Sequence, residues 1–338
     1  MKAAVMEGIN KLVLKDIQLP VINEEEVLVK VKACSVCGSD VESLETGLWM
    51  PNLPTVLGHE VSGVIAEIGS KVEGLKPGDR VALEPNAPCW KCDLCRRGNY
   101  HLCEKTVHIG NHINGGFAEY VKIHYMNAYR ISDNISFEEA SLMEPVGVCL
   151  EAVRRSRLAI GENVLIVGDG PFGLLFVQLC KIAGANNIYL SGRRDFRMKL
   201  AEKYGAIVIN VKKEDVVERI KKETKGKGVQ VVLDASGSTV FFDKVFEMTA
   251  YRGRIVLFSH TKDKPHFDIT PVQMKELEIL GSVNNPHTFE AVDRLISRKK
   301  IVLSDIITHR LGLEQIHEGI EMIQKKENGL LKAVVNFD

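Results

Sequence analysis

The sequence predicts an α/β protein of two domains, one mainly antiparallel β and one doubly wound on a parallel sheet. Its 338 residues exceed the roughly 250–300 residues at which single cores divide. Short β-type runs separated by Gly and Pro occupy the chain up to about residue 145. From about 150 to 285, short apolar runs alternate with longer helical stretches. This alternation is typical of a parallel sheet covered on both faces.

The individual elements follow this division. In the first part we expect the strands EVLVKVKACSV, GHEVSGVIAEIG, GDRVAL and GGFAEYVKI. In the second we expect the strands ENVLIVG, NIYLSG, IVIN, VQVVLDASG and GRIVLFS, with helices at PFGLLFVQLCKIAGA and DFRMKLAEKYGA. The remaining chain has two helical stretches and the strand KAVVNF, which is too little for a separate domain. The predicted domains are therefore 1–149 and 150–285, with 286–338 returning to complete the first.

Composition excludes several classes of protein. Apolar residues make up 45% and charged residues 26%, and Lys plus Arg balance Asp plus Glu at 44 each, so no footprint for nucleic acid is expected. No apolar run approaches the roughly 20 residues that span a bilayer, and the amino terminus does not read as a secretion signal. We expect a cytoplasmic location and a small-molecule partner. In that setting the eight cysteines read as thiols or metal ligands.

A glycine-rich turn predicts a dinucleotide site. Gly168, Gly170 and Gly173, with Pro171 and Phe172 between them, fit G-x-G-x-x-G directly after an apolar strand and at the start of a helix. The first glycine permits the tight turn, the second lets the backbone approach a pyrophosphate, and the third lets the helix pack on the strand. The alternative is a glycine-rich turn that binds no ligand.

The next strand bears on the choice of nucleotide. It ends at Ser191, followed after Gly192 by Arg193 and Arg194, with no acid before Asp195. A carboxylate at this point would bind the ribose 2′-hydroxyl of NAD, whereas a small residue and arginines accommodate a 2′-phosphate. NADP(H) is favoured. NAD(H) remains the alternative, with the arginines at an exposed helix start and Asp195 binding the ribose.

The run CWKCDLCRRGNYHLC contains Cys89, Cys92, Cys95 and Cys103 within a polar lobe of about 86–105. Four thiolates satisfy the tetrahedral geometry of zinc and leave no position for a substrate, so this site is expected to be structural. The alternatives are four unrelated buried cysteines or a nucleic-acid-binding zinc ribbon, and the neutral net charge argues against the ribbon.

A second, dispersed set consists of Cys37, His59, Glu60 and Glu144. With the motifs around it, the chain resembles the zinc-containing medium-chain dehydrogenase/reductase superfamily over essentially its whole length. The branch it resembles is that of sorbitol, galactitol-1-phosphate and threonine dehydrogenases. The motifs are CGSD, GHE, GDRV, the four-cysteine lobe, GGFAEY, Glu144-Pro145, the glycine turn and GSVNNP.

The resemblance implies a GroES-like catalytic domain and a Rossmann nucleotide domain. It also implies a catalytic zinc held by Cys37, His59 and Glu144, with Glu60 a nearby or alternative ligand, and so two zinc ions per chain. Cysteine, imidazole and carboxylate leave a fourth position open, as a Lewis-acid zinc requires.

Further roles follow from the same resemblance. Ser39 is expected to bond the alcohol oxygen and begin a proton relay, Asp40 to orient His59, and Asn284 of GSVNNP to contact the cofactor. Glu42 stands where many relatives carry the histidine that ends the relay, which leaves the relay terminus open.

The predicted activity is hydride transfer between a secondary alcohol, such as a polyol or cyclitol, and a nicotinamide cofactor, giving the ketone. The alternatives are a threonine-type amino alcohol dehydrogenase, a steroid or ketone reductase, a zinc-free reductase, or a catalytically silent zinc- and nucleotide-binding protein. Residues 46–51, including Trp49 and Met50, are expected to line the substrate cleft. Cys34, Cys149 and Cys180 are expected to be ordinary buried residues, and a homodimer or homotetramer is implied by the resemblance.

Overall fold

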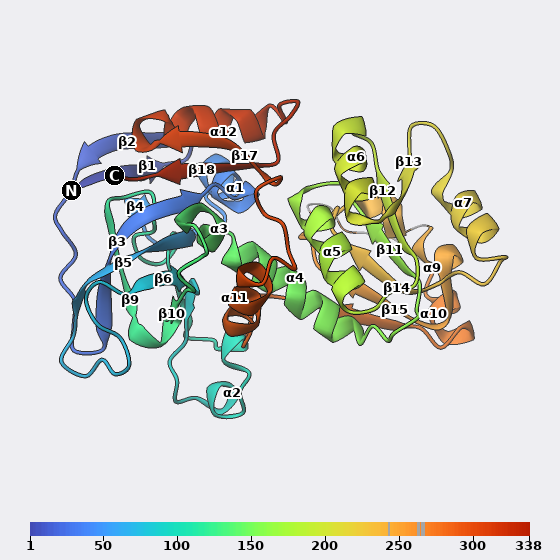
Figure 1. The fold of residues 1–338 in the computed structure, drawn as a ribbon, viewed down its shortest axis with the longest axis horizontal. Helices are drawn as coiled ribbons and strands as arrows, with labels where there is room; N and C mark the ends of the chain where they lie inside the picture. Colours follow the sequence, from blue (N-terminus) through green and yellow to red (C-terminus); the bar gives the residue numbers. More distant parts are fainter. Residues whose placement is uncertain (243, 262–263, 265–267) are drawn as a thin grey trace. The chain divides into compact units, whose positions relative to one another are not determined.

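The computed structural model describes residues 1–242, 244–261, 264 and 268–338. The chain forms two compact units (Figure 1). The first unit is Met1–Gly147 together with Asn285–Asp338, and the second is Val148–Asn284. The second unit is therefore an insertion within the first.

The first unit is mainly β. A seven-stranded sheet has the order β10-β6-β5-β3-β18-β17, with β9 also pairing with β3, and smaller sheets have the orders β2-β1-β4 and β7-β8. The strands are β1 (Lys2–Gly8), β2 (Lys11–Asp16), β3 (Glu26–Ser35), β4 (Thr55–Val56), β5 (Glu60–Ile68), β6 (Arg80–Leu83), β7 (Asn86–Ala87), β8 (Val107–His108), β9 (Tyr120–His124), β10 (Ala128–Arg130), β17 (Ile307–Gly312) and β18 (Lys332–Asn336).

The helices of the first unit are short. They are α1 (Gly38–Thr46), α2 (Asp93–Arg96), α3 (Phe137–Ser141), α11 (Phe289–Ser297) and α12 (Ile316–Gln324), with 3₁₀ turns η1 (Tyr100–Leu102), η2 (Tyr125–Asn127) and η3 (Leu313–Gln315). The longer helix α4 (Met143–Ser156) begins in the first unit and ends in the second.

Strand β3 organises the core of the first unit. It pairs antiparallel with β5, β9 and β18, and its residues Val27, Val29 and Val31 are fully buried among the apolar side chains of this unit. Strand β5 approaches β3 so closely that a Cβ at Gly63 would lie 2.2 Å from the Lys30 carbonyl oxygen. Only glycine fits there, which fixes the strand that begins at Glu60.

The second unit is a parallel sheet of six strands in the order β13-β12-β11-β14-β15-β16. Helices α5 and α6 contact each other, as do α7 and α9, and the two pairs lie on opposite sides of the sheet (Figure 1). The elements are β11 (Val164–Val167), α5 (Pro171–Ile182), β12 (Ile188–Gly192), α6 (Asp195–Tyr204), β13 (Ile207–Asn210), α7 (Val216–Glu223), β14 (Val229–Asp234), α8 (Thr239–Phe242), α9 (Val245–Met248), β15 (Thr249–Leu257), α10 (Thr270–Met274) and β16 (Glu278–Gly281). This is the doubly wound fold that the alternating pattern predicts.

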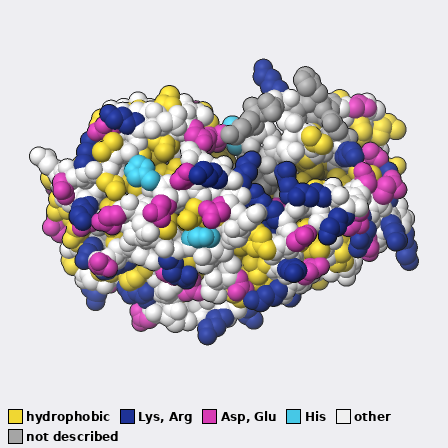
Figure 2. All heavy atoms as spheres, turned by 90° about the horizontal axis from the view of Figure 1, so that it is seen from above, with side chains coloured by type: hydrophobic (Ala, Val, Ile, Leu, Met, Phe, Trp, Pro, Cys, Tyr) yellow, Lys and Arg dark blue, Asp and Glu magenta, His cyan; other side chains and the backbone are white. Residues whose placement is uncertain are grey.

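The strands expected from the sequence are present, and others accompany them. The hairpin of β1 and β2 pairs from Lys2↔Asp16 to Gly8↔Lys11, and β16 forms an edge of the parallel sheet. No described helix is long and apolar enough to cross a membrane. Basic and acidic side chains are interspersed over much of the face in Figure 2, in keeping with the zero net charge.

Candidate metal centres and nucleotide site

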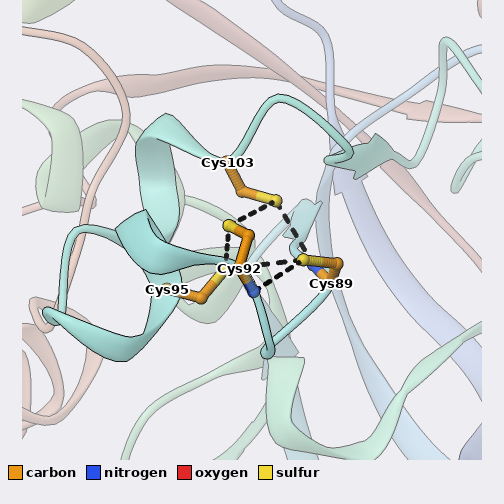
Figure 3. Close-up of side chains that lie close together, drawn as sticks. All are labelled: Cys89, Cys92, Cys95 and Cys103. Carbon is orange, nitrogen blue, oxygen red and sulfur yellow. Dashed lines mark hydrogen bonds between the residues drawn. The ribbon is translucent and has the colours of Figure 1, made fainter.

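The four cysteines of the lobe converge on one point (Figure 3). The Cys92 sulfur lies 3.4 Å from that of Cys95 and 3.8 Å from that of Cys103, and the Cys89 and Cys95 sulfurs are 3.9 Å apart. Four sulfurs about 2.3 Å from one zinc ion in a tetrahedron are about 3.8 Å from each other. The separations are too long for disulfides and fit a closed zinc site.

Backbone amides in the lobe donate hydrogen bonds to cysteine sulfurs and so favour their thiolate form. The Cys92 amide donates to the Cys89 sulfur, and the amides of Cys89 and Lys105 donate to the Cys103 sulfur, each over 3.4 Å. The amides of Lys91 and Cys92 lower the pKa of the Cys89 thiol to about 6, whereas burial raises that of Cys95 to about 12. At least one sulfur is thus set to be a thiolate near neutral pH, the form that binds zinc.

A buried carboxylate joins the lobe to the β core. Glu84, which follows β6 and is 1% exposed, accepts hydrogen bonds from the hydroxyls of Tyr100 and Tyr129, over 3.2 and 3.1 Å. Tyr100 lies in the lobe, and its hydroxyl accepts from the His287 amide. Burial raises the pKa of Glu84 to about 7. Hydrogen bonds thus join the lobe to both chain segments of the first unit, Met1–Gly147 and Asn285–Asp338.

The second group is assembled from separate elements. Ligand atoms of Cys37, His59 and Glu60 lie within 4.8 Å of one another. Cys37 is the N-cap of α1, Glu60 is the first residue of β5, and His59 immediately precedes that strand. A soft thiolate, an imidazole and a carboxylate form a donor set that fits a catalytic zinc.

Asp40 orients this group, as expected. Its carboxylate accepts from the Cys37 amide over 2.9 Å and the Gly58 amide over 3.2 Å, and lies 3.2 Å from Nδ1 of His59. Since the carboxylate accepts only, Nδ1 carries the hydrogen and Nε2 is free to bind a metal. Burial alone would lower the pKa of His59, but Asp40 and Cys37 outweigh it and the pKa is raised.

Lys332 was not anticipated from the sequence. Its Nζ donates to both carboxylate oxygens of Glu60, at 2.6 Å for Oε2, and the two residues are 5% and 0% exposed. Burial would lower the pKa of Lys332, but the charge of Glu60 raises it. Glu60 therefore has a permanent cationic partner besides any metal. The only indication of Lys332 in the sequence was a lysine at the start of the apolar strand KAVVNF. A lysine at that position is equally typical of a strand end that faces solvent.

Glu144 stands in the first turn of α4, and Ser39 in the first turn of α1 beside Cys37. The Glu144 carboxylate is not part of the compact group found among the described residues, although the charges of His59 and Glu60 act on it. Burial, opposed by His59, raises the pKa of Glu144 to about 7. The structure thus brings the ligand atoms of Cys37, His59 and Glu60 within 4.8 Å of one another. Glu144, the fourth expected ligand, lies outside this group, but its carboxylate is influenced by the charges of His59 and Glu60.

A second histidine lies against the group. The rings of His108 and His59 have centroids 5.3 Å apart, tilted by 57°. Burial and the charge of His59 lower the pKa of His108 to about 3. The sequence analysis did not select His108, because no spacing rule connects it with the GHE motif.

In the second unit, the glycine turn has the geometry of a phosphate site. Gly168 has φ +114°, and a Cβ at Gly173 would lie 2.0 Å from the Gly168 carbonyl oxygen. A Cβ at Gly170 would meet nothing within 4 Å, so the turn is open on that side. Helix α5 begins there with Gly170 as its N-cap and Pro171 at its start. Its amides are directed at the position where a pyrophosphate would bind.

The residues after β12 are arranged by Asp169. Its carboxylate accepts from the amides of Arg193 and Arg194, each over 2.8 Å. Arg193 is exposed, and Arg194 is the N-cap of α6. Asp195 accepts from the side chain of Asn210 and pairs with Lys213 at 3.8 Å. The Ser191 side chain is 4% exposed, and its hydroxyl donates to the Ile166 carbonyl over 3.4 Å.

Comparisons with known proteins agree with this arrangement. Residues 23–133 match the alcohol dehydrogenase GroES-like domain, and residues 171–298 match the zinc-binding dehydrogenase family. The chain is 31% identical to sorbitol dehydrogenase of Bacillus subtilis, over 99% of this chain and 97% of the relative. It is 36% identical to L-threonine 3-dehydrogenase of Bacillus velezensis, over 94% and 93%. A zinc-binding dehydrogenase structure from Sinorhizobium meliloti, bound to NADP, superposes with TM-score 0.93 at 31% identity, covering 99% of both chains.

A GroES-like β domain carrying a Cys, His and Glu group, joined to a doubly wound domain with a phosphate turn, defines a zinc-dependent dehydrogenase that uses a nicotinamide cofactor. The chain belongs to the zinc-dependent medium-chain dehydrogenase/reductase superfamily, in its polyol dehydrogenase branch. It is an alcohol or polyol dehydrogenase.

Proposed function

We propose that this enzyme oxidises secondary alcohols that carry a second polar group beside the reacting carbinol, with NADP(H) as the favoured cofactor. The observation that carries the proposal is the Cys37, His59 and Glu60 group, whose ligand atoms lie within 4.8 Å, with His59 oriented by Asp40. The two named relatives act on sorbitol and on carbon 3 of L-threonine. Both compounds have a hydroxyl or amino group next to the carbinol.

The residues that we propose to take part in catalysis all belong to the first unit. Cys37, His59 and Glu144 hold the catalytic zinc, and Glu60 serves as a nearby or alternative ligand whose charge Lys332 balances. Zinc bound there supplies a Lewis acid that makes the carbinol hydroxyl more acidic. Ser39, in the first turn of α1, accepts the hydroxyl proton while its own hydroxyl proton passes outward along the relay, whose terminus is open. Loss of this proton allows the hydride to leave the carbinol carbon for the nicotinamide.

The preference for NADP(H) rests on the end of β12. Arg193 and Arg194 supply cationic side chains after the small residues Ser191 and Gly192, and cations suit a 2′-phosphate. Asp195, the acid that could bind the ribose of NAD, is engaged by Asn210 and Lys213. The glycine turn, with Pro171 and Phe172, binds the pyrophosphate, and Asn284 also contacts the cofactor.

The lobe cysteines hold the second, structural zinc in this proposal. The assembly is a homodimer or homotetramer, and the open edge strand β16 with the half-exposed Ile279 and Val283 offers a surface for a second copy. A cytoplasmic enzyme is consistent with eight free cysteines.

A substrate screen tests the function. Purified enzyme is assayed on polyols, cyclitols, amino alcohols and simple ketones with NADP(H) and NAD(H) in parallel. We expect turnover of alcohols with an adjacent hydroxyl or amino group and a KM for NADP at least about tenfold below that for NAD. A tenfold preference for NAD would refute the nucleotide assignment. Turnover restricted to simple ketones would refute the substrate class.

Zinc content tests the metal assignment separately. Two ions per chain fit one catalytic and one structural site, whereas one ion would leave only the closed site filled and would fit a catalytically silent protein. Mass spectrometry of the native protein measures both the zinc count and the number of subunits.

A further inference from the structure

Two neighbouring strands of the second unit end side by side, and an acid follows one of them. Strands β11 and β12 are parallel and paired, with Val167 opposite Ser191, so the turns that follow them lie at the same edge of the sheet. Asp169 follows β11, between Gly168 and Gly170 of the glycine turn. A doubly wound sheet binds dinucleotides in the crevice outside this edge. Asp169 therefore lies in the region that meets the nucleotide.

The Asp169 side chain occupies the space that a side chain at Gly192, the last residue of β12, would need. A Cβ at Gly192 would lie 2.5 Å from the Asp169 Cβ and 2.8 Å from its Oδ2. Both separations are shorter than van der Waals contact, so only glycine fits there beside Asp169. The end of this second strand is where a dinucleotide site ordinarily carries the acid that bonds the adenosine ribose. The glycine turn thus brings a carboxylate to a place where β12 has no side chain.

The two oxygens of this carboxylate are in different surroundings. Oδ2 accepts the amides of Arg193 and Arg194, each over 2.8 Å, which holds the side chain against the turn after β12. Oδ1 has no hydrogen-bond partner among the described residues, yet it is not one of their unpaired atoms that are shielded from solvent. Oδ1 is therefore accessible, and Asp169 as a whole is 8% exposed. A carboxylate oxygen that is held in place and open to solvent can accept a hydrogen bond from a ligand.

The surrounding charges give this carboxylate opposite effects on the two nicotinamide dinucleotides. It attracts a ribose 2′-hydroxyl as a hydrogen-bond donor and repels a 2′-phosphate. The amides of Arg193 and Arg194 already donate to Asp169, so a 2′-phosphate would be held by the two guanidinium groups instead. Asp195, the next acid in the chain, is engaged by two other side chains of the second unit.

We infer that Asp169 is a specificity-determining residue that accepts a hydrogen bond from the adenosine ribose 2′-hydroxyl of NAD(H) and opposes the 2′-phosphate of NADP(H). The inference rests on the proposed function and deepens it. Arg193 and Arg194 favour NADP(H), whereas Asp169 limits that preference and keeps NAD(H) usable. The acid of an NAD site is thus supplied by the glycine turn, in place of the strand end.

Binding of three dinucleotides tests this inference: NADH, NADPH, and an NADH analogue that lacks only the 2′-hydroxyl of the adenosine ribose. Fluorescence titration of the zinc-loaded enzyme gives each Kd. Asp169→Asn keeps an acceptor for the two amides; it is expected to weaken NADH binding about tenfold without weakening NADPH binding. Wild type should bind the analogue about tenfold more weakly than NADH, and Asp169→Asn should bind the two within about twofold. Glu202→Gln, at an exposed acid of α6, is the control.

The outcomes separate this inference from a structural role and from the proposed function. Equal weakening of NADH and NADPH by Asp169→Asn would reduce the residue to a brace of the turn and overturn the inference, as would no change in either Kd. The loss of NADH binding appearing in Asp195→Asn instead would also overturn it. The analogue needs no variant: wild type that binds it as tightly as NADH refutes the inference even if Asp169→Asn, checked by its Tm, fails to fold. Wild type that binds NADH about tenfold more tightly than NADPH would contradict the proposed preference for NADP(H) alone.

Discussion

The two cysteine-containing groups of the first unit are built in opposite ways. The lobe takes all its sulfurs from fifteen residues, Cys89 to Cys103, and orients them with its own backbone amides. The other group takes Cys37 from a helix N-cap, Glu60 from the start of a strand and His59 from the loop before it, and Asp40 and Lys332 pair with His59 and Glu60. A contiguous site can be filled completely and is suited to support. A dispersed site is held in place by residues around it, so a metal bound there could keep an open position for substrate.

The largest effect is expected from a substitution that removes a proposed metal ligand of the dispersed site. Cys37→Ala should lower kcat about 10³-fold, because a catalytic metal contributes several kcal/mol to the transition state. The cofactor Kd should stay near the wild-type value, since the glycine turn belongs to the second unit. Steady-state rates measure kcat, and fluorescence titration with NADPH measures the cofactor Kd. Cys180→Ala, a buried cysteine of α5, is the control; near-normal turnover by Cys37→Ala would remove this residue from the site.

Lys332→Met should destabilise the first unit by about 3–5 kcal/mol, because it leaves the carboxylate of Glu60 buried without a partner. Denaturant unfolding without added zinc measures the loss. The double variant Glu60→Gln with Lys332→Met should recover most of it, since both charges are then absent. If the single variant is as stable as wild type, the ion pair does not compensate the burial of Glu60.

Cys92→Ser tests the supporting role of the lobe. We expect loss of one zinc and a Tm lower by about 5–10 °C, corresponding to about 2–3 kcal/mol, with turnover per folded molecule retained. Asp93→Asn, at an exposed position of the same lobe, should leave the Tm unchanged. Full thermal stability combined with lost turnover would reverse the proposed division between the two sites.

Asp40→Asn tests a difference between the two sites. The Asp40 carboxylate orients a proposed metal ligand of the dispersed site, whereas the described contacts of the lobe sulfurs include no carboxylate. Zinc affinity at the catalytic site should fall about 10- to 100-fold, as is usual when the partner of a ligating histidine is altered. Competition with a chelator measures the affinity, and excess zinc should restore turnover. Glu45→Gln, on the same helix α1, is the control. Turnover that stays low at saturating zinc would give Asp40 a role other than holding His59.

The smallest effect concerns the link between lobe and core. Because burial raises the pKa of Glu84 from its usual 4.5 to about 7, the folded protein binds this proton more tightly than the unfolded chain. The stabilisation is therefore present below pH 4.5 and is lost as pH rises to about 7. Glu84→Gln should flatten this part of the Tm profile, because the amide does not titrate. An unchanged slope would show that Glu84 titrates normally.

The sequence was most informative where interactions are local. The cysteine spacing predicted the lobe, and the glycine turn with its alternating strands predicted the doubly wound unit, because each depends on neighbours along the chain. The proposed metal ligands of the dispersed site were expected only because of the resemblance. Among their neighbours, Asp40 was expected from the same resemblance, whereas Lys332 and His108 were not: Lys332 is 272 positions from Glu60, and no residue pattern connects His108 with His59.

Some strands were missed for a similar reason. The edge strand β16 has a mixed exposure pattern, with Glu278 and Ile279 both exposed, so it shows no clear alternation. The first hairpin had a usable signal in Gly8 and Asn10: Gly8 pairs with Lys11 across a two-residue turn, in which Asn10 has φ +55°. The observed division, after Gly147 and before Asn285, lies inside elements and loops whose boundaries patterns locate only approximately.

The position of β18 has a consequence for biosynthesis. This strand pairs with β3 and brings Lys332 to Glu60, yet the whole second unit precedes it in the chain. On the ribosome, the nucleotide-binding unit can therefore complete its sheet while the metal-binding unit still lacks a central strand and the cation that balances a buried carboxylate. The catalytic site is therefore completed last, because β18 and Lys332 are translated only after the cofactor domain.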